Sequence, residues 1–369
     1  MGKFGFIIHP LDISDVSRKF KVAKYFPDSV LEGIIKYVPA IETSHITGAR
    51  SQYGEAEGWF IGVTLTPKQM MNLPLPFVLK KIIQGARLAE KLGAKIVGLG
   101  AFTSVVGDAG ITIAKNVNIA VTTGNSYTVA TALEGTREAA RMMGIDLRRA
   151  QVAVVGATGS IGSVSSKVLA REVKNLTIVG RDQRRLEALA QQILQENGLV
   201  VRVSTDLKAT LRQADVILTV TSSMESIIEP EDLKSGAVVC DVSRPRDVSR
   251  RVVDERKDVL VIEGGVVEVP GDVDFHFNFG FPPKTSYACM AETMMLAMEG
   301  RYENFSLGRD MTVAQIDEIN RLAKKHGFRV AGFRSFERAV TREEIEAVRR
   351  NAEKKLHLSL TPEVKTAGS

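Results

Sequence analysis

The sequence predicts an α/β protein, and two observations support that prediction. Short apolar runs alternate with segments of helical periodicity along most of the 369 residues, as in sheets flanked by helices. In addition, the apolar stretch at residues 152–155 runs directly into a turn that contains Gly156, Gly159 and Gly162. A strand that breaks at glycine and continues as a helix indicates the first turn of a dinucleotide-binding βαβ unit. We therefore expect two α/β domains, the second of them a doubly wound parallel Rossmann sheet.

Each glycine of this turn has its own role in the predicted nucleotide site. Gly156 permits the tight turn, Gly159 lets the backbone approach a pyrophosphate, and Gly162 lets the helix pack closely on the strand. The free N–H groups and the positive dipole end of the helix then face the phosphates. The alternative interpretation is a purely structural glycine-rich turn. The predicted cofactor contacts of the turn are Gly156, Thr158, Gly159, Ser160, Ile161 and Gly162.

The composition excludes several classes of protein. Charged residues make up 25% of the chain and hydrophobic residues 44%, which suffices for two cores. The net charge of +6 favours an acidic partner or an anionic substrate, unless it only reflects a solvated surface. Basic residues do not interleave with aromatic ones, so we expect no nucleic-acid partner. No apolar run approaches the roughly 20 residues of a membrane-spanning helix, so we expect no integral membrane protein.

Cysteine and histidine are scarce. Two cysteines, Cys240 and Cys289, argue against a disulfide scaffold and favour a cytoplasmic protein in a reducing environment. The five histidines show no paired spacing, so we expect no metal site. Cys240 lies inside an apolar strand, which predicts that it packs in the core.

Residues 1–145 are predicted to form a substrate-binding α/β domain. The expected strands are 4–8, 58–65, 95–100 and 119–122. The expected helices are parts of 16–37, then 77–92 before Gly93, and 129–143 before Gly144.

Residues 146–285 are predicted to form the dinucleotide-binding domain. Six strands are expected, at 152–155, 176–179, 200–203, 214–220, 237–241 and 259–262, with helices at 163–173 and 184–197. Residues 286–369 are predicted to form helices that pack back on the domain cleft and on the first domain. The first of them should begin at Ser286 as N-cap and run to Met298, and the last should begin near Arg338.

The position that selects the dinucleotide contains arginine. An acidic residue that binds the ribose normally stands at the end of the second strand, and this sequence has Gly180 and Arg181 there. An arginine suits a 2′-phosphate through a charge-assisted, bidentate contact. Arg184 and Arg185 add positive charge nearby, or form a solvated helix face. The sequence therefore predicts NADPH as the cofactor.

Polar or glycine-rich clusters follow several predicted strands. Carboxyl ends of parallel strands meet at one edge of a sheet, where the nicotinamide is expected. Each cluster is also consistent with ordinary turn chemistry. The candidate residues are Ser104 and Asn125 in the first domain, and Thr221, Ser222, Gly264 and Gly265 after strands of the second.

Cys289 is the candidate nucleophile. It would lie in the first turn of the helix after Ser286, where the helix dipole stabilises a thiolate and Lys284 adds positive charge. A thiolate can accept an acyl group as a thioester, which hydride then reduces to an aldehyde. The alternative is a small buried side chain without a catalytic role.

Six segments carry a resemblance to a known family, in the same order and up to about Phe328. They are residues 99–104, 122–125, 152–163, 264–268, 287–292 and 299–309. Together they resemble the long-chain acyl-(acyl-carrier-protein) reductases, which form fatty aldehydes. The glycine turn is common to many dehydrogenases, whereas the segment around Cys289 and the Asn304-Phe305-Ser306 stretch are far more specific.

This resemblance implies NADPH-dependent reduction of a fatty acyl thioester to the aldehyde. The cysteine nucleophile of the family corresponds to Cys289. Backbone N–H groups, or the side chains of Ser104 or Asn125, are expected to steady the oxyanion. The acyl donor is expected to be acyl carrier protein or acyl-CoA, and a downstream enzyme would use the aldehyde. The basic charge balance suits an acidic carrier protein.

Two other functions remain open on the sequence alone. One is a dehydrogenase of the shikimate or quinate type, which transfers hydride directly to a ketone and would normally need a Lys/Asp pair. Lys115 and Asp108 are near each other in sequence, but no strand end organises them. The other is a non-catalytic protein that binds NADPH.

Overall fold

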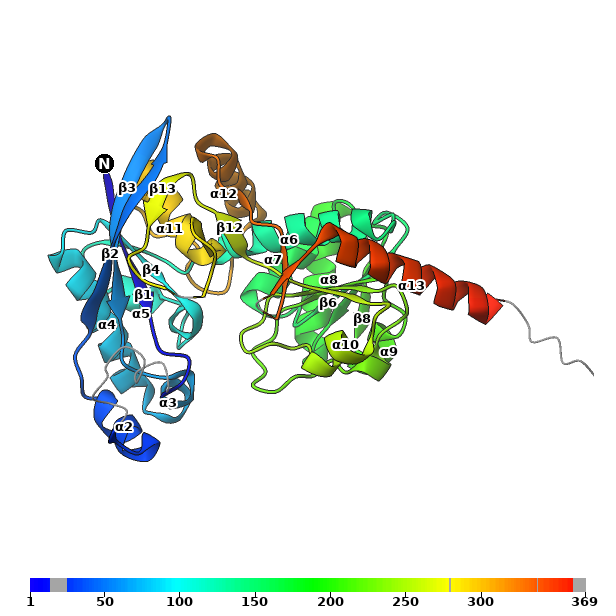
Figure 1. The fold of residues 1–369 in the computed structure, drawn as a ribbon, viewed down its shortest axis with the longest axis horizontal. Helices are drawn as coiled ribbons and strands as arrows, with labels where there is room; N and C mark the ends of the chain where they lie inside the picture. The colour runs from blue at the N-terminus through cyan, green and yellow to red at the C-terminus, as the bar shows by residue number, and fades with distance from the viewer. Residues whose placement is uncertain (14–24, 279, 337, 361–369) are drawn as a thin grey trace, which may run out of the picture. The chain divides into compact units, whose positions relative to one another are not determined.

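The computed structural model describes residues 1–13, 25–278, 280–336 and 338–360 (Figure 1), and the chain divides into two compact units. Unit 1 comprises Met1–Ala130 and Gly265–Ala331, and unit 2 comprises Thr131–Gly264 and Gly332–Ser369. This division differs from the expected boundaries after residues 145 and 285. The reason is that helix α6 (Asn125–Met142) starts in unit 1 and ends in unit 2, and the chain returns to unit 1 directly after its last Rossmann strand.

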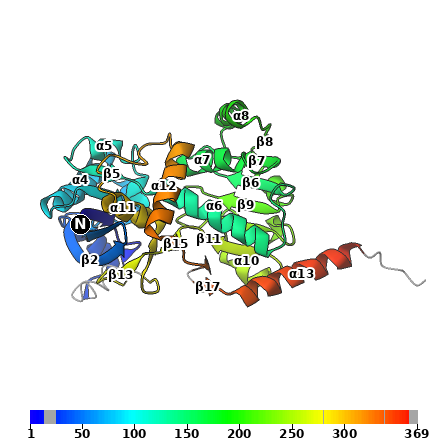
Figure 2. The ribbon, with the colours of Figure 1, turned by 90° about the horizontal axis from the view of Figure 1, so that it is seen from above.

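Unit 2 contains the predicted doubly wound sheet. Its six strands lie in the order β11-β10-β9-β6-β7-β8, and all of them are parallel. Figure 2 shows β9, β6, β7 and β8 following one another across this sheet. The strands are β6 (Gln151–Val155), β7 (Asn175–Val179), β8 (Arg202–Ser204), β9 (Val216–Thr219), β10 (Val238–Asp241) and β11 (Leu260–Glu263). The prediction of a Rossmann fold is therefore confirmed.

Local sequence signals set the helices of unit 2. Asp182 is the N-cap of α8 and accepts the backbone N–H of Arg185, and Gly198 ends that helix with φ +71°. The helices are α7 (Ser160–Leu169), α8 (Gln183–Asn197), α9 (Leu207–Leu211), α10 (Arg250–Glu255) and α13 (Arg342–Leu360). A small hairpin of β16 (Phe333–Ser335) and β17 (Arg338–Val340) precedes α13.

Unit 1 is built on a mixed sheet in the order β13-β2-β3-β1-β4-β5. Strands β3, β1, β4 and β5 are parallel, whereas β2 pairs antiparallel with both β3 and β13. The strands are β1 (Gly2–Ile8), β2 (Ile41–Ser51), β3 (Gly54–Gly62), β4 (Ile96–Leu99), β5 (Ala120–Thr122) and β13 (Gly271–Asp274). Strand β2 was not predicted, because its residues are mostly polar or half-exposed and show no apolar run.

Two helices cover opposite faces of this sheet. Helix α4 (Leu75–Lys91) buries an apolar stripe that includes Ile82 and Ala89, and a Cβ on Gly5 of β1 would lie 2.5 Å from Ala89 Cβ. Helix α11 (Ala288–Met298) lies on the other face, where a Cβ on Gly98 of β4 would lie 2.1 Å from Thr293 Oγ1. Gly5 of β1 pairs with Val97 of β4, so Val97 points to the α4 face. Side chains alternate between the two faces of a strand, and the next residue, Gly98, therefore points to the α11 face.

Glycines let α11 lie unusually close to the sheet. A Cβ on Gly2, Gly54 or Gly98 would lie 2.0 to 2.6 Å from atoms of α11. Residues Met290 to Met298 of this helix are all buried, which explains why its sequence is mostly apolar, with Glu292 and Thr293 as exceptions. The methionines of α11 are therefore core residues of unit 1.

The remaining elements of unit 1 are short. The helices are α2 (Asp28–Ile35), α3 (Pro67–Asn72), η2 (Ala101–Ser104), α5 (Ile111–Ala114) and α12 (Val313–His326), and the strands are β12 (Val266–Glu268), β14 (Thr285–Tyr287) and β15 (Arg329–Val330). Of the helical segment expected within 16–37, residues 16–24 lie outside the described residues. Helix α12 lies in the region 286–369 that was predicted to form helices, but its bounds were not predicted, although a capping box of Thr312 and Gln315 marks its start. Within the described ranges, no helix has both the length and the apolarity needed to cross a lipid bilayer.

The expected N-cap of α11 is wrong. Helix α11 begins one residue later, with Tyr287 as N-cap and no side-chain cap. Ser286 instead pairs with Val267 between β14 and β12, and its hydroxyl donates to the Tyr287 carbonyl. Strand pairing therefore outweighs the capping preference of serine at this position.

Candidate functional site

The glycine turn of unit 2 has the geometry of a phosphate cradle. Gly156 has φ +78°, and a Cβ there would lie 2.5 Å from the Val220 carbonyl oxygen. A Cβ on Gly162 would lie 2.3 Å from the Gly156 carbonyl oxygen. Neither position can carry a side chain without moving the backbone, which is the steric reason for glycine at both.

Gly159 is open in contrast. It is the N-cap of α7, and its nearest neighbour to an added Cβ is the Gly156 carbonyl oxygen at 3.3 Å. The first-turn N–H groups of a helix, here those of Ser160, Ile161 and Gly162, have no acceptor within the helix itself. A pyrophosphate can therefore approach the backbone at Gly159, and the chain fits a dinucleotide at this turn.

The end of β7 presents arginine beside this turn. Arg181 is exposed, and the neighbouring Gly180 approaches Thr158, since a Cβ there would lie 3.6 Å from Thr158 Cγ2. The Arg185 guanidinium donates to the Thr158 carbonyl at 3.0 Å. The acid next to Arg181, Asp182, is the N-cap of α8 and accepts the Arg185 N–H at 3.2 Å. This geometry fits a 2′-phosphate.

A buried carboxylate that was not predicted organises the end of β9. Asp247 accepts hydrogen bonds from Thr219 Oγ1 at 2.5 Å, from the Thr221 N–H at 3.0 Å and from Ser243 Oγ at 2.5 Å. It also accepts a short hydrogen bond from the Thr221 hydroxyl. Thr221 is thereby fixed at the carboxyl edge of the sheet, and the adjacent Ser222 is exposed. Asp247 lies in an irregular loop, where no periodic pattern of residues could predict that it accepts these hydrogen bonds.

Gly264 and Gly265, which follow β11, have different structural roles. A Cβ on Gly264 would lie 3.1 Å from Ala132 Cβ, so this residue permits close packing within unit 2. Gly265 has φ +91°, and its carbonyl accepts the Ala288 N–H at 2.6 Å. Gly265 therefore fixes the start of α11 in unit 1, and a role of either glycine in cofactor binding stays a prediction.

Cys289 lies in the first turn of α11, against the end of β5. A Cβ on Gly124 would lie 2.2 Å from Cys289 Cα and 2.3 Å from Cys289 Cβ, so these two backbones are in direct contact. The residue is only partly exposed, and burial of the thiol raises the Cys289 pKa to about 12. The N–H groups of Met290, Cys289 and Ala101 face the sulfur and oppose this rise.

This raised pKa corrects the expectation of a stabilised thiolate. Desolvation of the sulfur outweighs the helix N-terminus and the three N–H groups, and the negative charge of Glu292 acts in the same direction as desolvation. Lys284 does not help either, because its ammonium pairs with Asp272 at 2.7 Å. The resting side chain is therefore a thiol that must lose its proton when it reacts.

One of the two predicted oxyanion residues directly follows the residue that contacts Cys289. Asn125 follows Gly124 and is the first residue of α6, whereas the sequence placed it in a loop. Its side chain is buried, with 7% of its surface exposed. Ser104 is also buried, at the end of η2, and its hydroxyl donates to the Ala101 carbonyl at 2.7 Å. Ala101 itself faces the sulfur, so η2 also borders the site.

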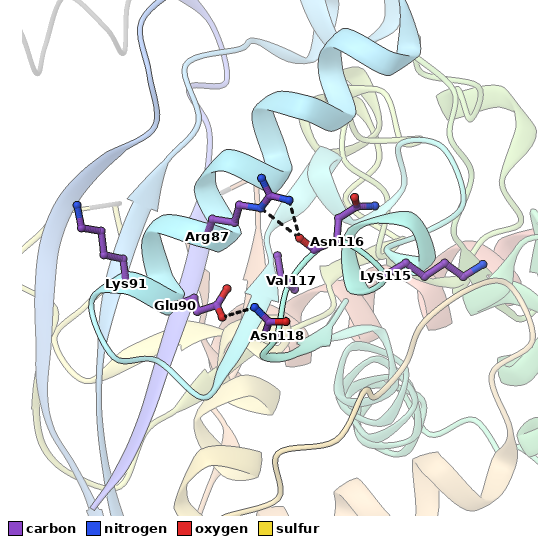
Figure 3. Close-up of a pocket in the computed structure, with 7 residues that line it drawn as sticks. All are labelled: Arg87, Glu90, Lys91, Lys115, Asn116, Val117 and Asn118. Carbon is purple, nitrogen blue, oxygen red and sulfur yellow. Dashed lines mark hydrogen bonds between the residues drawn. The ribbon is translucent and has the colours of Figure 1, made fainter.

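A surface depression at the other end of β5 is separate from this site. Arg87 donates from Nε and Nη2 to the Asn116 carbonyl, and Asn118 donates to Glu90 at 3.0 Å (Figure 3). These residues precede β4 and β5, whereas Cys289 touches the segment that follows β5. The polar groups of the depression largely satisfy one another, and we assign no reaction to it.

Comparison with known proteins identifies the family. The model of the shikimate / quinate 5-dehydrogenase family matches residues 137–263. The chain is 31% identical over 343 residues to the long-chain acyl-(acyl-carrier-protein) reductase of Synechococcus elongatus, covering 88% of this chain and 98% of that protein. It is 29% identical over 357 residues to the aminotransferase PigE of a Serratia species, and 28% identical over 180 residues to the glutamyl-tRNA reductase of Cyanophora paradoxa.

The extent of these matches differs. The chain spans about two fifths of the length of PigE and of the glutamyl-tRNA reductase, at 41% and 40%, but nearly all of the Synechococcus reductase. The family relationship and the Rossmann topology support NADPH as the cofactor. The chain therefore belongs to the family of long-chain acyl-(acyl-carrier-protein) reductases and is an NAD(P)-dependent oxidoreductase.

Proposed function

We propose that this protein reduces a fatty acyl thioester to the aldehyde with NADPH, through an acyl-enzyme on Cys289. The observation that supports this proposal most directly is the position of Cys289. It is a cysteine in the first turn of a helix, in contact with Gly124, and Gly124 is followed directly by the buried Asn125. A cysteine that served only as core filling would not need a neighbouring polar group of this kind.

In the acyl-transfer step, Cys289 Sγ attacks the thioester carbonyl carbon. The new C–S bond to Cys289 forms as the C–S bond to the donor breaks, and the thiol proton of Cys289 passes to the departing donor sulfur. The N–H groups of Ala101 and Met290 favour the developing thiolate, which opposes the effect of burial. The Asn125 amide donates to the carbonyl oxygen as it gains charge, with Ser104 as the alternative donor.

Bound NADPH supplies the hydride that reduces the enzyme-bound thioester. In unit 2, Gly159 and the N–H groups of Ser160 and Ile161 would hold the pyrophosphate, and Arg181 would pair with the 2′-phosphate. Asp247 keeps Thr221 and Ser222 at the sheet edge where the nicotinamide is expected. Gly264 and Gly265 are included in this proposed cofactor site.

The acyl donor is proposed to be acyl carrier protein or acyl-CoA. Both donors are anionic, and the net charge of +6 favours their approach. We further propose that the protein acts in the cytoplasm and passes its aldehyde to a downstream enzyme. The domain assignment follows the reaction, with acyl binding in unit 1 and NADPH binding in unit 2.

Intact-protein mass spectrometry tests the covalent step. Wild-type protein incubated with a long-chain acyl thioester, without NADPH, is expected to gain one acyl mass that disappears when NADPH is added. Cys289→Ala should gain none. Cys240→Ala is the matched control, because Cys240 is fully buried in β10 with a pKa raised to about 12 by burial, and it should acylate like wild type. Absence of an adduct on every variant would contradict the proposal.

The second candidate is direct hydride transfer to a ketone, as in shikimate or quinate dehydrogenases. It is favoured only by the family model that matches residues 137–263. Cys289→Ala should leave such an enzyme fully active. A protein that binds NADPH without turnover would bind it tightly and oxidise it with neither thioester nor ketone.

A further inference from the structure

The strongest unexplained feature of unit 1 is a buried carboxylate one helical turn after Cys289. Glu292 is completely buried. Its oxygens accept hydrogen bonds from Thr122 Oγ1 at 2.5 Å, Ser306 Oγ at 2.8 Å and the Tyr127 N–H at 2.8 Å. In the described part of the chain no lysine, arginine or histidine forms an ion pair with it. Burying an acid without a cation is unfavourable, so such a residue usually has a specific task.

The residues that donate hydrogen bonds to Glu292 indicate what this carboxylate does. Thr122 and Tyr127 lie on either side of Gly124, and Gly124 contacts Cys289 directly. Thr122 Oγ1 also accepts the Gly124 N–H at 3.2 Å, so the same network includes the residue in contact with the nucleophile. Two hydrogen bonds that Glu292 accepts, from Thr122 and Tyr127, therefore connect the segment 122–127 to the helix that contains Cys289.

The start of α6 explains why this side chain must come from another element. Gly124 precedes α6, and its carbonyl accepts the first helical bond, from the Thr128 N–H at 3.2 Å. A residue at this position normally caps the helix with its own side chain, but any side chain there would collide with Cys289. Glu292 supplies the missing acceptor to the Tyr127 N–H. Gly124 thus provides the close contact with Cys289, and Glu292 provides the cap of α6.

We propose that Glu292 is a positioning residue for acyl transfer. Its carboxylate holds the segment 122–127 against Cys289 and so aims the Asn125 amide at the carbonyl oxygen of the substrate. This inference rests on the proposed function, since Asn125 acts on an acyl group bound at Cys289. Ser306 supports the network from a third segment, because its hydroxyl also accepts the Ser126 N–H at 3.3 Å.

Single-turnover acylation of Cys289, followed by intact-protein mass, tests this role. Glu292→Met keeps the volume but removes the acceptors, and the acylation rate is expected to fall about 100-fold, as for a misplaced catalytic group. Glu292→Gln keeps one oxygen for the Tyr127 N–H and should recover part of the rate. Asn125→Ala should slow the wild type but add little in the Glu292→Met background, because both changes remove the same interaction.

A matched control separates positioning from stability. Glu299 follows α11 and accepts His326 Nε2 at 2.6 Å, so Glu299→Met also removes a hydrogen-bonded acid near this helix. It should lower thermal stability and leave the acylation rate unchanged. Hydrogen exchange of the peptide that contains residues 122–127 should speed up in Glu292→Met but not in Glu299→Met. If Glu292→Met does not fold, Thr122→Val and Ser306→Ala each remove one donor and should show smaller losses of rate.

The outcomes distinguish this inference from the proposed function. No acylation of the wild type removes the proposed function and the inference with it. Wild-type acylation with an unchanged rate in Glu292→Met overturns the inference alone. Equal losses in Glu292→Met and Glu299→Met, or losses that multiply fully with Asn125→Ala, also overturn it, because both results indicate a general structural effect.

Discussion

The two units build their candidate sites by different routes. In unit 2 the phosphate cradle lies on one continuous stretch, from Gly156 to Gly162, directly after β6. In unit 1 the surroundings of Cys289 come from residues 101–104, 122–127 and 304–306, which are far from it in sequence. Both units nevertheless place their sites where parallel strands end, and both use a buried carboxylate there, Asp247 or Glu292.

The separation between hydrogen-bonded partners shows the difference. Asp247 accepts from Thr219, 28 residues away, whereas Glu292 accepts from Thr122, 170 residues away. The contiguous glycine turn of unit 2 can be recognised in the sequence, whereas Asp247 lies in an irregular loop and was not predicted even at this shorter separation. A long separation leaves only a buried acid in a mostly apolar helix, which no local pattern explains. The comparison teaches that adjacent residues specify the glycine turn of unit 2, whereas residues distant in sequence specify the surroundings of Cys289 in unit 1.

The largest expected effect comes from breaking the contact between Gly124 and Cys289. Gly124→Ala should lower the free energy of unfolding by about 3 to 4 kcal/mol and abolish acylation, since it adds a clash to the strain of φ +73°. Gly198→Ala is the control, because φ is +71° there and an added Cβ meets nothing within 4 Å. It should lower stability by about 1 kcal/mol. Equal losses in urea unfolding would contradict the close contact.

A smaller effect is expected on nucleotide binding in unit 2. Arg181→Ala should weaken NADPH binding about 10- to 100-fold and leave NADH binding nearly unchanged, because a charge-assisted hydrogen bond to the 2′-phosphate is lost. Fluorescence titration with both nucleotides measures this. Arg148→Ala removes an exposed charge before β6 and should change neither affinity. Equal weakening of both nucleotides by Arg181→Ala would refute the selection by this residue.

The pH dependence of Cys289 sharpens the comparison at the nucleophile. Burial raises the thiol pKa to about 12, so the thiolate fraction grows about tenfold per pH unit well below that value. Iodoacetamide modification of Cys289 should therefore rise about tenfold per unit from pH 7 to 10 without a plateau. Peptide mass spectrometry at short reaction times gives the rates. A plateau near pH 7 would mean that the resting cysteine is a thiolate.

Much of the fold follows from the sequence. Periodicity and glycine positions predicted six parallel strands in unit 2, and the strands β1, β3, β4 and β5 of unit 1, with boundaries a few residues off. The predictions failed where partners are distant in sequence. The polar strand β2 forms because β3 and β13 flank it, and Ser286 pairs in β14 and does not cap α11. The domain boundaries were misplaced because α6 continues from one unit into the other.

By itself, the sequence determined the Rossmann turn, the arginine beside it and the identity of the candidate cysteine. These features are local, since a few adjacent residues specify the backbone conformation or the charge. Only the tertiary structure decided the surroundings of Cys289. Its raised pKa, its contact with Gly124 and the capping of α6 by Glu292 depend on desolvation and on close packing between distant segments. Those effects depend on residues that are close in space but distant in the chain, so no local stretch of sequence predicts them.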